Sequence, residues 1–377
     1  METHAMKFRE VPELTGIRAL AIGIVFVSHT ISPIVPGGLG VTIFFFLSGY
    51  LITSLLRGEA SQMGRISLKR FYIRRTLRIM PPLYVTLILS WLLWRWHILV
   101  MRAPDWAAVT SQWLYYSNYE RIWGSARGWP SPLWSLAVEE HFYLLFPLLF
   151  GTILMKMKAK SAALACIAAC FFILLVRIIQ GAQGAYWLDL NYFCTHTRID
   201  SILWGCALAL WNNPIMDEDA WKPSTPWFIG GASIVVIAAI VQQPFFAETL
   251  RYTLQGIGLY LIFGYVLTGH RMTSLILNNA AARWVGIWSY TIYLVHEEAF
   301  KIVRYWTHLP HLITAVVSFA ASCAVAIAMY ALIERPCAKL RRRLHKERAP
   351  RPIELQQSEA PVEEATAKVE NNQLKAY

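Results

Sequence analysis

Long apolar segments recur along this sequence and constrain its fold more than any other feature. Most are long enough to cross, as a helix, a bilayer core roughly 30 Å thick. Hydrophobic residues make up 56% of the chain, a share typical of membrane proteins. The sequence therefore predicts an all-α, polytopic membrane protein with about ten transmembrane helices. The windows lie near residues 14–34, 39–56, 80–100, 138–155, 161–179, 196–211, 227–243, 252–268, 285–303 and 311–334.

The distribution of Lys and Arg between these windows predicts the orientation. Residues 57–78, after the second window, contain seven of them, whereas the turn ISPIVPGG after the first window contains none. Further basic stretches lie at 156–160 and 335–351. An even number of spans places all three on one side, so both termini are expected in the cytoplasm by the positive-inside rule. The formal net charge of +12 then reflects contact with membrane lipids, without a nucleic-acid partner.

The apolar windows predict one folded domain over residues 1–345, followed by a disordered cytoplasmic tail over 346–377. The tail is rich in Glu, Gln, Lys, Ala and Pro and has few large apolar residues. The first window lacks a small-residue cleavage site, so we expect it to remain in the mature protein. The six cysteines show no paired spacing and predict neither a disulfide framework nor a metal site.

The first window carries two ionisable residues, Arg18 and His29, in an otherwise apolar run. Such residues are costly inside a membrane and are functional candidates, although one near a helix end can also extend to the interface. Eleven residues at about 100° each return to within roughly 20° of the starting direction, about 16 Å farther along the helix. We therefore expect both side chains to share one face and a common cavity or partner.

Arg75 and Arg78 lie on one helical face just before Pro81 and Pro82, whereas Arg74 should point elsewhere. An arginine pair at a membrane boundary is often only an anchor that fixes the topology. It can also bind phosphates, because each guanidinium donates two parallel, charge-assisted hydrogen bonds. Both interpretations are compatible with the sequence.

The fourth window opens with Glu139, Glu140 and His141. Neighbours on a helix point about 100° apart, so at most one of the two acids is expected to face inward. For Glu140 and His141 we favour an ordinary role at the helix N-terminus after Ser135, where acidic side chains offset the helix dipole.

Two later windows carry further candidates. Arg198 and Asp200 are two residues apart and face nearly opposite ways, so separate partners are expected rather than a mutual ion pair. His296 is interpreted as a hydrogen-bonded packing residue, with a catalytic role as the alternative. The small residues around Ser48 and Gly49 are attributed to close helix packing.

Six motifs in this order resemble those of the membrane-bound acyltransferase family 3, over roughly residues 10 to 337. Each is weak alone, but the ordered set is specific. They read LTGIRALAIGIVFVSH, FFFLSGYLI, FYIRRTLRIMPP, PLWSLAVEEHFYLLFP, RIDSILWG and WVGIWSYTIYLVH.

The resemblance implies a bundle of about ten transmembrane helices in a bacterial cytoplasmic (inner) membrane, with acyl-CoA, usually acetyl-CoA, as the donor and no metal. It implies catalytic roles for His29 and Glu139, and donor binding by Arg18, Arg75 and Arg78. The candidates Arg198, Asp200 and His296 have no assigned role. Thr15 and His141 depart from the Asp and Gln of many members, outside this set. Some relatives carry an additional extracytoplasmic esterase-like domain that this sequence does not include, so acceptor delivery is expected to be direct.

The residues themselves agree with O-acylation, because an imidazole has an ordinary pKa near working pH and can take the proton of a hydroxyl. The expected acceptor is a glycan or a lipid-linked glycan. Aromatic side chains between residues 101 and 134 could stack on sugar rings, although an interfacial aromatic belt is equally natural there. A small molecule such as a macrolide remains an alternative acceptor. A transporter or flippase is disfavoured by the ordered motifs and by the absence of paired interrupted helices.

Overall fold

The computed structural model describes residues 11–99, 105–123 and 131–346, and within these ranges the chain forms helices and no strands. Each predicted apolar window overlaps one principal helix. This confirms the all-α class and the polytopic membrane architecture. The principal helices are α1 (Pro12–Thr30), α2 (Gly37–Met63), α3 (Leu68–Arg95), α6 (Trp134–Thr152), α7 (Ala159–Gly181), α10 (Asp200–Leu210), α11 (Thr225–Ile240), α13 (Leu250–Val266), α15 (Ala280–Thr307) and α16 (His311–Met329).

Six helical stretches in the described ranges are by themselves long and apolar enough to cross a membrane. Helices α10 and α11 are apolar but shorter. The sixth window is divided at Ile199, where the single turn α9 (Thr195–Arg198) meets α10. The bundle therefore combines full-length spans with shorter helices that need neighbours to cover their ends.

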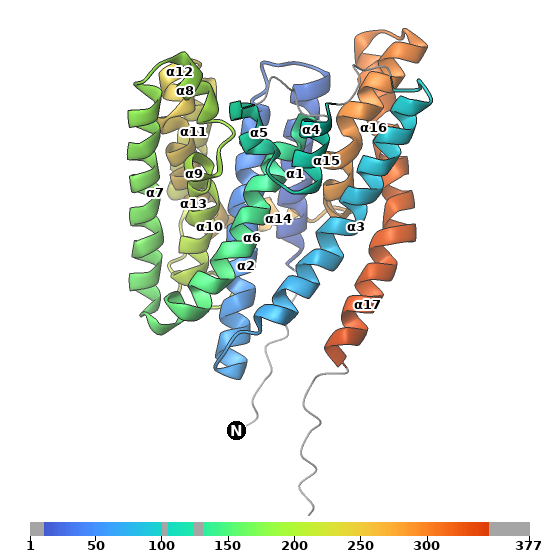
Figure 1. Ribbon diagram of the computed structural model, residues 1–377. Helices are drawn as coiled ribbons and strands as arrows, with labels where there is room; N and C mark the ends of the chain where they lie inside the picture. The colour runs from blue at the N-terminus through green and yellow to red at the C-terminus, as the bar shows by residue number, and fades with distance from the viewer. Residues whose placement is uncertain (1–10, 100–104, 124–130, 347–377) are drawn as a thin grey trace, which may run out of the picture. The chain divides into compact units, whose positions relative to one another are not determined.

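The short helices of residues 11–338 gather mainly at one end of the bundle. Figure 1 shows α4 (Trp106–Trp113), α5 (Ser117–Trp123), α8 (Ala185–Leu190) and α12 (Pro244–Glu248) at its upper end, while the α2–α3 and α6–α7 connections lie at its lower end. The basic residues of 57–78 and 156–160 lie in these lower connections and in the helical turns on either side of them. The remaining short elements are η1 (Ser131–Leu133), η2 (Leu154–Lys156), α14 (Arg271–Leu277) and η3 (Tyr330–Glu334).

Close backbone packing joins α2 to α10, as the small residues predict. A Cβ added to Gly49 would lie 2.0 Å from the Ile202 carbonyl oxygen, and one added to Gly205 would lie 2.0 Å from that of Phe46. No side chain fits at either position, because both gaps are far below van der Waals contact. The pair fixes the position of α2 against α10.

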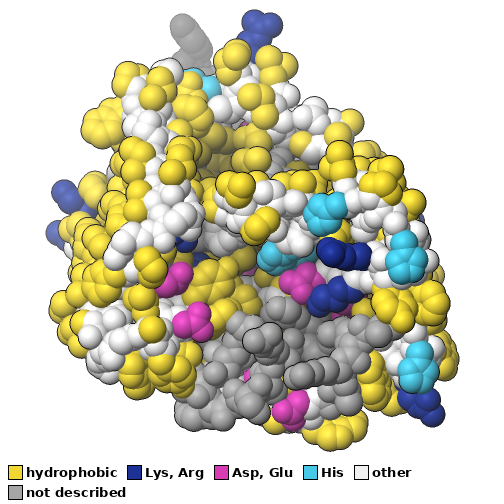
Figure 2. All heavy atoms as spheres, turned by 90° about the horizontal axis from the view of Figure 1, so that it is seen from above, with side chains coloured by type: hydrophobic (Ala, Val, Ile, Leu, Met, Phe, Trp, Pro, Cys, Tyr) yellow, Lys and Arg dark blue, Asp and Glu magenta, His cyan; other side chains and the backbone are white. Residues whose placement is uncertain are grey.

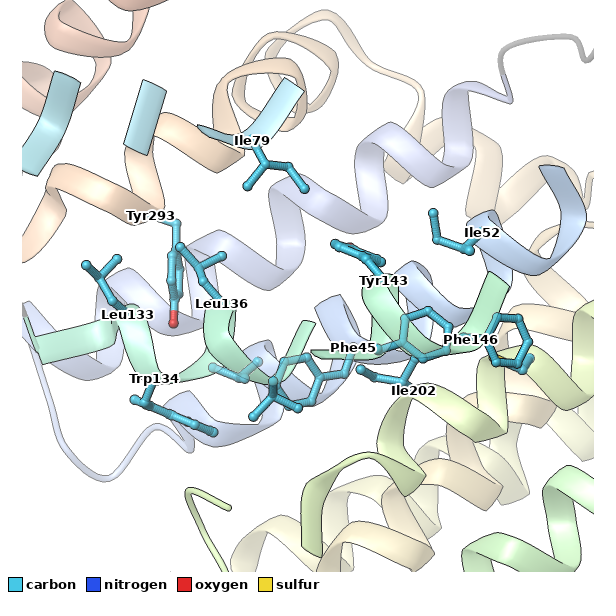
Figure 3. Packing of buried hydrophobic residues seen from close by; sticks show 14 of the residues in the cluster. Phe45, Ile52, Ile79, Leu133, Trp134, Leu136, Tyr143, Phe146, Ile202 and Tyr293 are labelled. Atoms are coloured by element: carbon cyan, nitrogen blue, oxygen red, sulfur yellow. The ribbon is translucent and has the colours of Figure 1, made fainter. Parts of the chain in front are cut away.

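Interlocking aromatic side chains form the core between α2, α6 and α15 (Figure 3). Phe45, Tyr143 and Tyr293 are all under a tenth exposed and come from these three helices in turn. The Phe45 ring meets Trp134 edge-on, with the ring centroids 6.2 Å apart. Phe45, Tyr143 and Tyr293 also line the cavity described below.

Two helices begin earlier than hydropathy predicts. Helix α3 starts at Leu68 instead of near residue 80 and continues through Pro81 and Pro82. Its first turns are rich in Lys and Arg, and these lower the average hydropathy of any window that includes them. Helix α6 starts at Trp134 instead of 138, with no acidic residue in its first turn. Both corrections change the surroundings of the predicted site residues.

A buried ion pair that the sequence analysis did not identify joins α7 to α10. The Arg177 Nη1 lies 2.8 Å from the Asp200 Oδ2, and both side chains are completely buried. Arg177 also donates to the Thr249 carbonyl at 2.9 Å and to Thr253 Oγ1 at 2.6 Å. Because every arm of the guanidinium is engaged, the charge is tolerated inside the bundle.

Helix α17 (Arg335–Lys346) is the last described element and is strongly basic. The predicted disordered tail, residues 346–377, lies outside the described residues except for Lys346, which ends this helix. The division into a domain of residues 1–345 and a tail stays a prediction.

Candidate active site

A cavity with about 930 Å³ of empty space, open solvent included, lies between α1, α2, α3, α6, α15 and η3. Its lining begins at Arg75 and Arg78 in the lower half of α3 and extends to Ser135 at the upper start of α6. Arg18 and Glu139 also line it. The structure thus brings together four residues that the sequence motifs singled out.

The cavity arginines lack carboxylate partners. Among the described residues, none of Arg18, Arg75 and Arg78 has a carboxylate oxygen within the 4.0 Å of an ion pair. By contrast, Arg74 pairs with Glu59 at 3.0 Å, so it points away as predicted. The lining also includes the carboxylates of Glu139 and Glu334, so three guanidiniums face two acids, and this excess of positive charge favours an anion.

Glu139 is held by a hydrogen-bond chain that crosses from α2 to α6. The Ser48 hydroxyl donates to Glu139 Oε1 at 2.6 Å, and the Tyr143 hydroxyl donates to Ser48 Oγ at 3.0 Å. The Arg75 guanidinium lies over the Tyr143 ring, 4.9 Å from its centre. Glu139 is therefore fixed at the cavity wall and faces inward, as one of the two acids was expected to do.

The second acid and its neighbour do not serve at the helix N-terminus. Because α6 begins at Trp134, Glu140 and His141 lie in its second turn, too far from the end to offset its dipole. One carboxylate oxygen of Glu140 is buried without a hydrogen-bond partner, while His141 Nδ1 lies 2.7 Å from Thr195 Oγ1. The N-terminal interpretation of these two residues was wrong.

A second polar group lies at the upper end of α1. His29 Nδ1 lies 2.9 Å from His296 Nε2, and the two rings are stacked at an interplanar angle of 12°. His29 Nδ1 is also 3.4 Å from Glu297 Oε1. His296 is therefore not isolated in the core, because its ring contacts the strongest catalytic candidate from the sequence.

The hydrogen-bond partners determine which nitrogen of each ring carries a proton. His296 Nδ1 lies 2.8 Å from the Tyr293 carbonyl oxygen, which can only accept, so this nitrogen must donate. In a neutral ring His296 Nε2 then accepts, and His29 Nδ1 is its donor. We infer that His29 Nε2 carries a free lone pair, the state that a general base requires.

The free nitrogen of His29 faces the N-terminus of α2. A Cβ added to Gly37 would lie 3.8 Å from His29 Nε2 and only 2.6 Å from Ser28 Oγ. The backbone N–H of Gly37 donates to that serine oxygen at 3.2 Å. The His29 side chain remains 36% exposed. Glycine thus leaves the approach to Nε2 open. Seen from above, the bundle shows histidine side chains beside acidic and basic ones (Figure 2).

Arg18 and His29 belong to two places in the structure, although one helix carries both, so the expectation of a common cavity or partner was wrong. Arg18 lines the cavity and His29 contacts α15. Tyr293 connects the two places: it lines the cavity, and its ring centre lies 5.7 Å from that of His296. Figure 3 shows Tyr293 beside Leu136 at one end of the aromatic core. The cavity therefore extends from the three arginines toward the histidine pair.

Arg198 and Asp200 have separate partners, as expected, and neither lines the cavity. Asp200 pairs with Arg177, whereas Arg198 lies 3.7 Å from the Tyr252 ring centre and donates to Thr42 Oγ1 at 3.2 Å. Both side chains are completely buried. They join α2, α7, α10 and α13, which is a structural arrangement.

The aromatic segment after α3 is described only in part. Trp106 is 70% exposed, while Trp113 stacks on Tyr84 with the ring centres 4.9 Å apart. Gln112 and Asn118 are buried, and Asn118 donates to Thr195 Oγ1 at 2.8 Å. The indole of Trp123 and all of Trp129 lie outside what the structure describes. Much of the described segment thus packs against the bundle, and Trp106 is its most open aromatic side chain.

Several site residues escaped the sequence analysis. Glu297 follows His296 directly, and its position beside a membrane histidine was the available signal. Glu334, in the π-helical turn η3, lines the cavity and accepts from Thr291 Oγ1 at 2.6 Å. Tyr143 carried no signal, because an aromatic residue in an apolar window is usually packing.

Comparison with known proteins places this geometry in context. The family described as "Acyltransferase domain" matches residues 11–333. The peptidoglycan O-acetyltransferase OatA of Listeria monocytogenes is 29% identical over 360 residues, covering 87% of this chain and 56% of that protein. A putative O-acetyltransferase of Staphylococcus aureus strain COL is 31% identical, with coverages of 80% and 52%.

A putative peptidoglycan O-acetyltransferase of Bacillus subtilis, YrhL, is 28% identical, covering 87% of this chain and 55% of that protein. The chain thus spans about half the length of the curated relatives it matches. No solved structure matches it. Since the family match covers every helix that builds the cavity and the histidine pair, up to the penultimate residue of η3, this chain belongs to the acyltransferase-3 family.

Proposed function

We propose that this protein is a membrane O-acetyltransferase that moves an acetyl group from acetyl-CoA to a hydroxyl of a cell-surface glycan. One observation carries the proposal: a cavity with three arginines that lack ion-pair partners extends toward a histidine pair whose outer nitrogen is free. The first arrangement suits a phosphorylated donor, and the second suits the activation of a hydroxyl.

The donor side of the proposal rests on charge. Acetyl-CoA carries several phosphate charges, and Arg18, Arg75 and Arg78 together supply three cations against the two carboxylates, Glu139 and Glu334, that line the same cavity. Arg75 and Arg78 lie in the lower half of α3, near the basic connections. If the lower end faces the cytoplasm, as the positive-inside rule predicts, the donor enters there.

The acceptor side rests on the histidine pair. His29 Nε2 takes the proton of the acceptor hydroxyl as its oxygen bonds to the thioester carbonyl carbon. The carbon–sulfur bond breaks, and the sulfur leaves with the electron pair and receives a proton. His296 Nε2 accepts from His29 Nδ1 and holds the ring in the reactive tautomer. The relatives named as peptidoglycan O-acetyltransferases support a glycan acceptor.

The activity can be tested with the full chain in liposomes. Protein reconstituted with acetyl-CoA carrying a labelled acetyl group is expected to release CoA when a glycan acceptor is present. In cells, mass spectrometry of surface glycans with and without the gene should show the loss of an acetyl-sized mass. If glycans are unchanged while a small secreted metabolite loses that mass, the acceptor is a small molecule such as a macrolide.

The orientation has its own test. A single cysteine at Pro36, in the turn between α1 and α2, is expected to react with a membrane-impermeant thiol reagent from outside the cell. A cysteine at Arg65, between α2 and α3, should react only after the membrane is permeabilised. The reverse pattern would contradict cytoplasmic termini and cytoplasmic donor entry.

A further inference from the structure

The histidine pair also forms a set of metal ligands. His29, His296 and Glu297 each offer one ligand atom, and the three atoms lie within 4.8 Å of one another. Two imidazole nitrogens and one carboxylate oxygen are a common ligand set for Zn²⁺, with the fourth position left to water. The set lies where α1 meets α15, and His29, in the last turn of α1, has a side chain that is 36% exposed.

The spacing of the ligand atoms fits such an ion with small movements. Tetrahedral zinc with bonds of about 2.0–2.2 Å separates its ligand atoms by about 3.3–3.5 Å. His29 Nδ1 lies 3.4 Å from Glu297 Oε1 and 2.9 Å from His296 Nε2. The second distance must widen by a few tenths of an ångström, and the third pair, between His296 and Glu297, lies within 4.8 Å.

The surrounding hydrogen bonds support the same use. Metal-binding histidines usually donate their other ring N–H to a carbonyl or carboxylate, which fixes the tautomer. His296 does so, because its Nδ1 donates to the Tyr293 carbonyl at 2.8 Å and leaves Nε2 for a ligand. Lys301 Nζ binds Glu297 Oε2 at 3.3 Å, which leaves Oε1 toward His29. Lys301 is also a like charge that weakens cation binding.

We propose that His29, His296 and Glu297 bind a divalent transition metal of the Zn²⁺ type, and that the bound metal inhibits acetyl transfer. Metal binding follows from the ligand geometry alone, whereas the inhibition rests on the proposed function.

The inhibition follows from the tautomer of His29. In the metal-free protein its Nδ1 carries the proton and Nε2 holds the free lone pair. A metal bound to Nδ1 replaces the proton on that nitrogen. The one proton of the neutral ring must then reside on Nε2. The nitrogen assigned as general base then cannot accept a proton from a hydroxyl. No electron transfer is involved, and removal of the metal restores the original tautomer.

Zinc binding to the full chain in detergent is the first measurement, by titration calorimetry with Zn²⁺ and, as a control cation, Mg²⁺. We expect one Zn²⁺ per chain and no Mg²⁺ binding at this site. His296→Ala and Glu297→Gln should each weaken the site by at least about 10- to 100-fold. His311→Ala, which removes an exposed histidine that contacts the Ile31 carbonyl oxygen and lies outside the cluster, should leave the affinity unchanged. If His296→Ala and Glu297→Gln bound Zn²⁺ as tightly as His311→Ala and the parent do, the site would be overturned.

Lys301→Gln provides a test in the opposite direction, in case the ligand variants fold poorly. It keeps all three ligands and removes the like charge, so zinc should bind several-fold more tightly. Unchanged or weaker binding would contradict the assignment of Glu297 as a ligand.

Acetyl transfer measured at increasing Zn²⁺ distinguishes the two proposals. Inhibition over the concentration range of binding, reversed by a chelator, supports both. Zinc binding without inhibition would overturn the inhibitory role and the assignment of His29 Nε2 as the base. An active enzyme that loses activity in His29→Ala but binds no zinc would overturn the metal site alone.

Discussion

The arginine cavity and the histidine pair differ in almost every physical property, although α1 contributes to both. The cavity collects three guanidiniums without ion-pair partners among the described residues, together with the carboxylates of Glu139 and Glu334. The histidine pair consists of two stacked rings at the upper end of the bundle, with the Glu297 carboxylate beside them. The first has the excess positive charge for an anion, and the second has the hydrogen bonds to handle one proton.

The difference indicates a division of labour along the bundle. Arg18 and His29 are separated by about 16 Å along one rigid helix, which is too far for one small group to touch both. A donor whose charged end and reactive end are far apart can occupy both places at once. Tyr293 contacts both places and marks the path between them. Substitutions in the cavity should therefore affect donor binding, and substitutions at the histidines should affect the transfer step.

The largest effect is expected from His29→Ala. Loss of a positioned general base lowers the rate by about 10²- to 10⁴-fold. The dissociation constant for acetyl-CoA should remain that of the parent, because the histidine lies outside the cavity lining. Transfer rates and donor binding measured on the same detergent preparation check both parts. A properly folded variant that transfers at near the parent rate would refute the base assignment.

Arg75→Ala and Arg78→Ala are expected to weaken donor binding next most strongly. Each charge-assisted contact contributes about 1.5–3 kcal/mol, or roughly a 10- to 150-fold change in the dissociation constant. Arg74→Ala is the matched control, because that side chain pairs with Glu59 outside the cavity. If the control weakened acetyl-CoA binding as much as the other two, the pair would be topology anchors rather than a phosphate site.

A smaller loss is expected from His296→Ala, which removes a positioning residue. It deletes the acceptor for His29 Nδ1, a hydrogen bond of about 0.5–1.5 kcal/mol, so transfer should slow by roughly 2- to 13-fold. His296→Gln keeps an amide oxygen that can accept this bond and should recover part of the rate. A purely structural role predicts no such rescue, which kinetics of the two variants would reveal.

The smallest effect is the coupling between the two regions. Sites far apart with no shared partner usually combine within about 0.5 kcal/mol. The double variant His29→Ala, Arg75→Ala should therefore bind acetyl-CoA with the affinity of Arg75→Ala alone. A coupling well above this, measured as a double-mutant cycle of dissociation constants, would show that the cavity and the histidine pair act as one site.

The helices could be predicted from sequence because a chain in lipid must satisfy its own backbone hydrogen bonds. An apolar segment long enough to cross the bilayer therefore indicates a helix. The start of α3 could not, since the Lys and Arg in its first turns lower the mean hydropathy of any window that includes them. Arg177 shows a different failure. It is an ionisable residue inside an apolar window, but its partner Asp200 lies on another helix and only packing brings them together.

The sequence by itself determined the class of fold, the family resemblance and four of the residues that line the cavity. Local pattern is sufficient for these, because helix periodicity fixes which neighbouring side chains share a face. Only the tertiary structure decided that Arg18 and His29 serve different places and that His296 is the partner of His29. Those two histidines are 267 positions apart in the chain. Their contact, their tautomers and the metal-ligand geometry with Glu297 depend on how α15 packs on α1, and no local pattern encodes that distance.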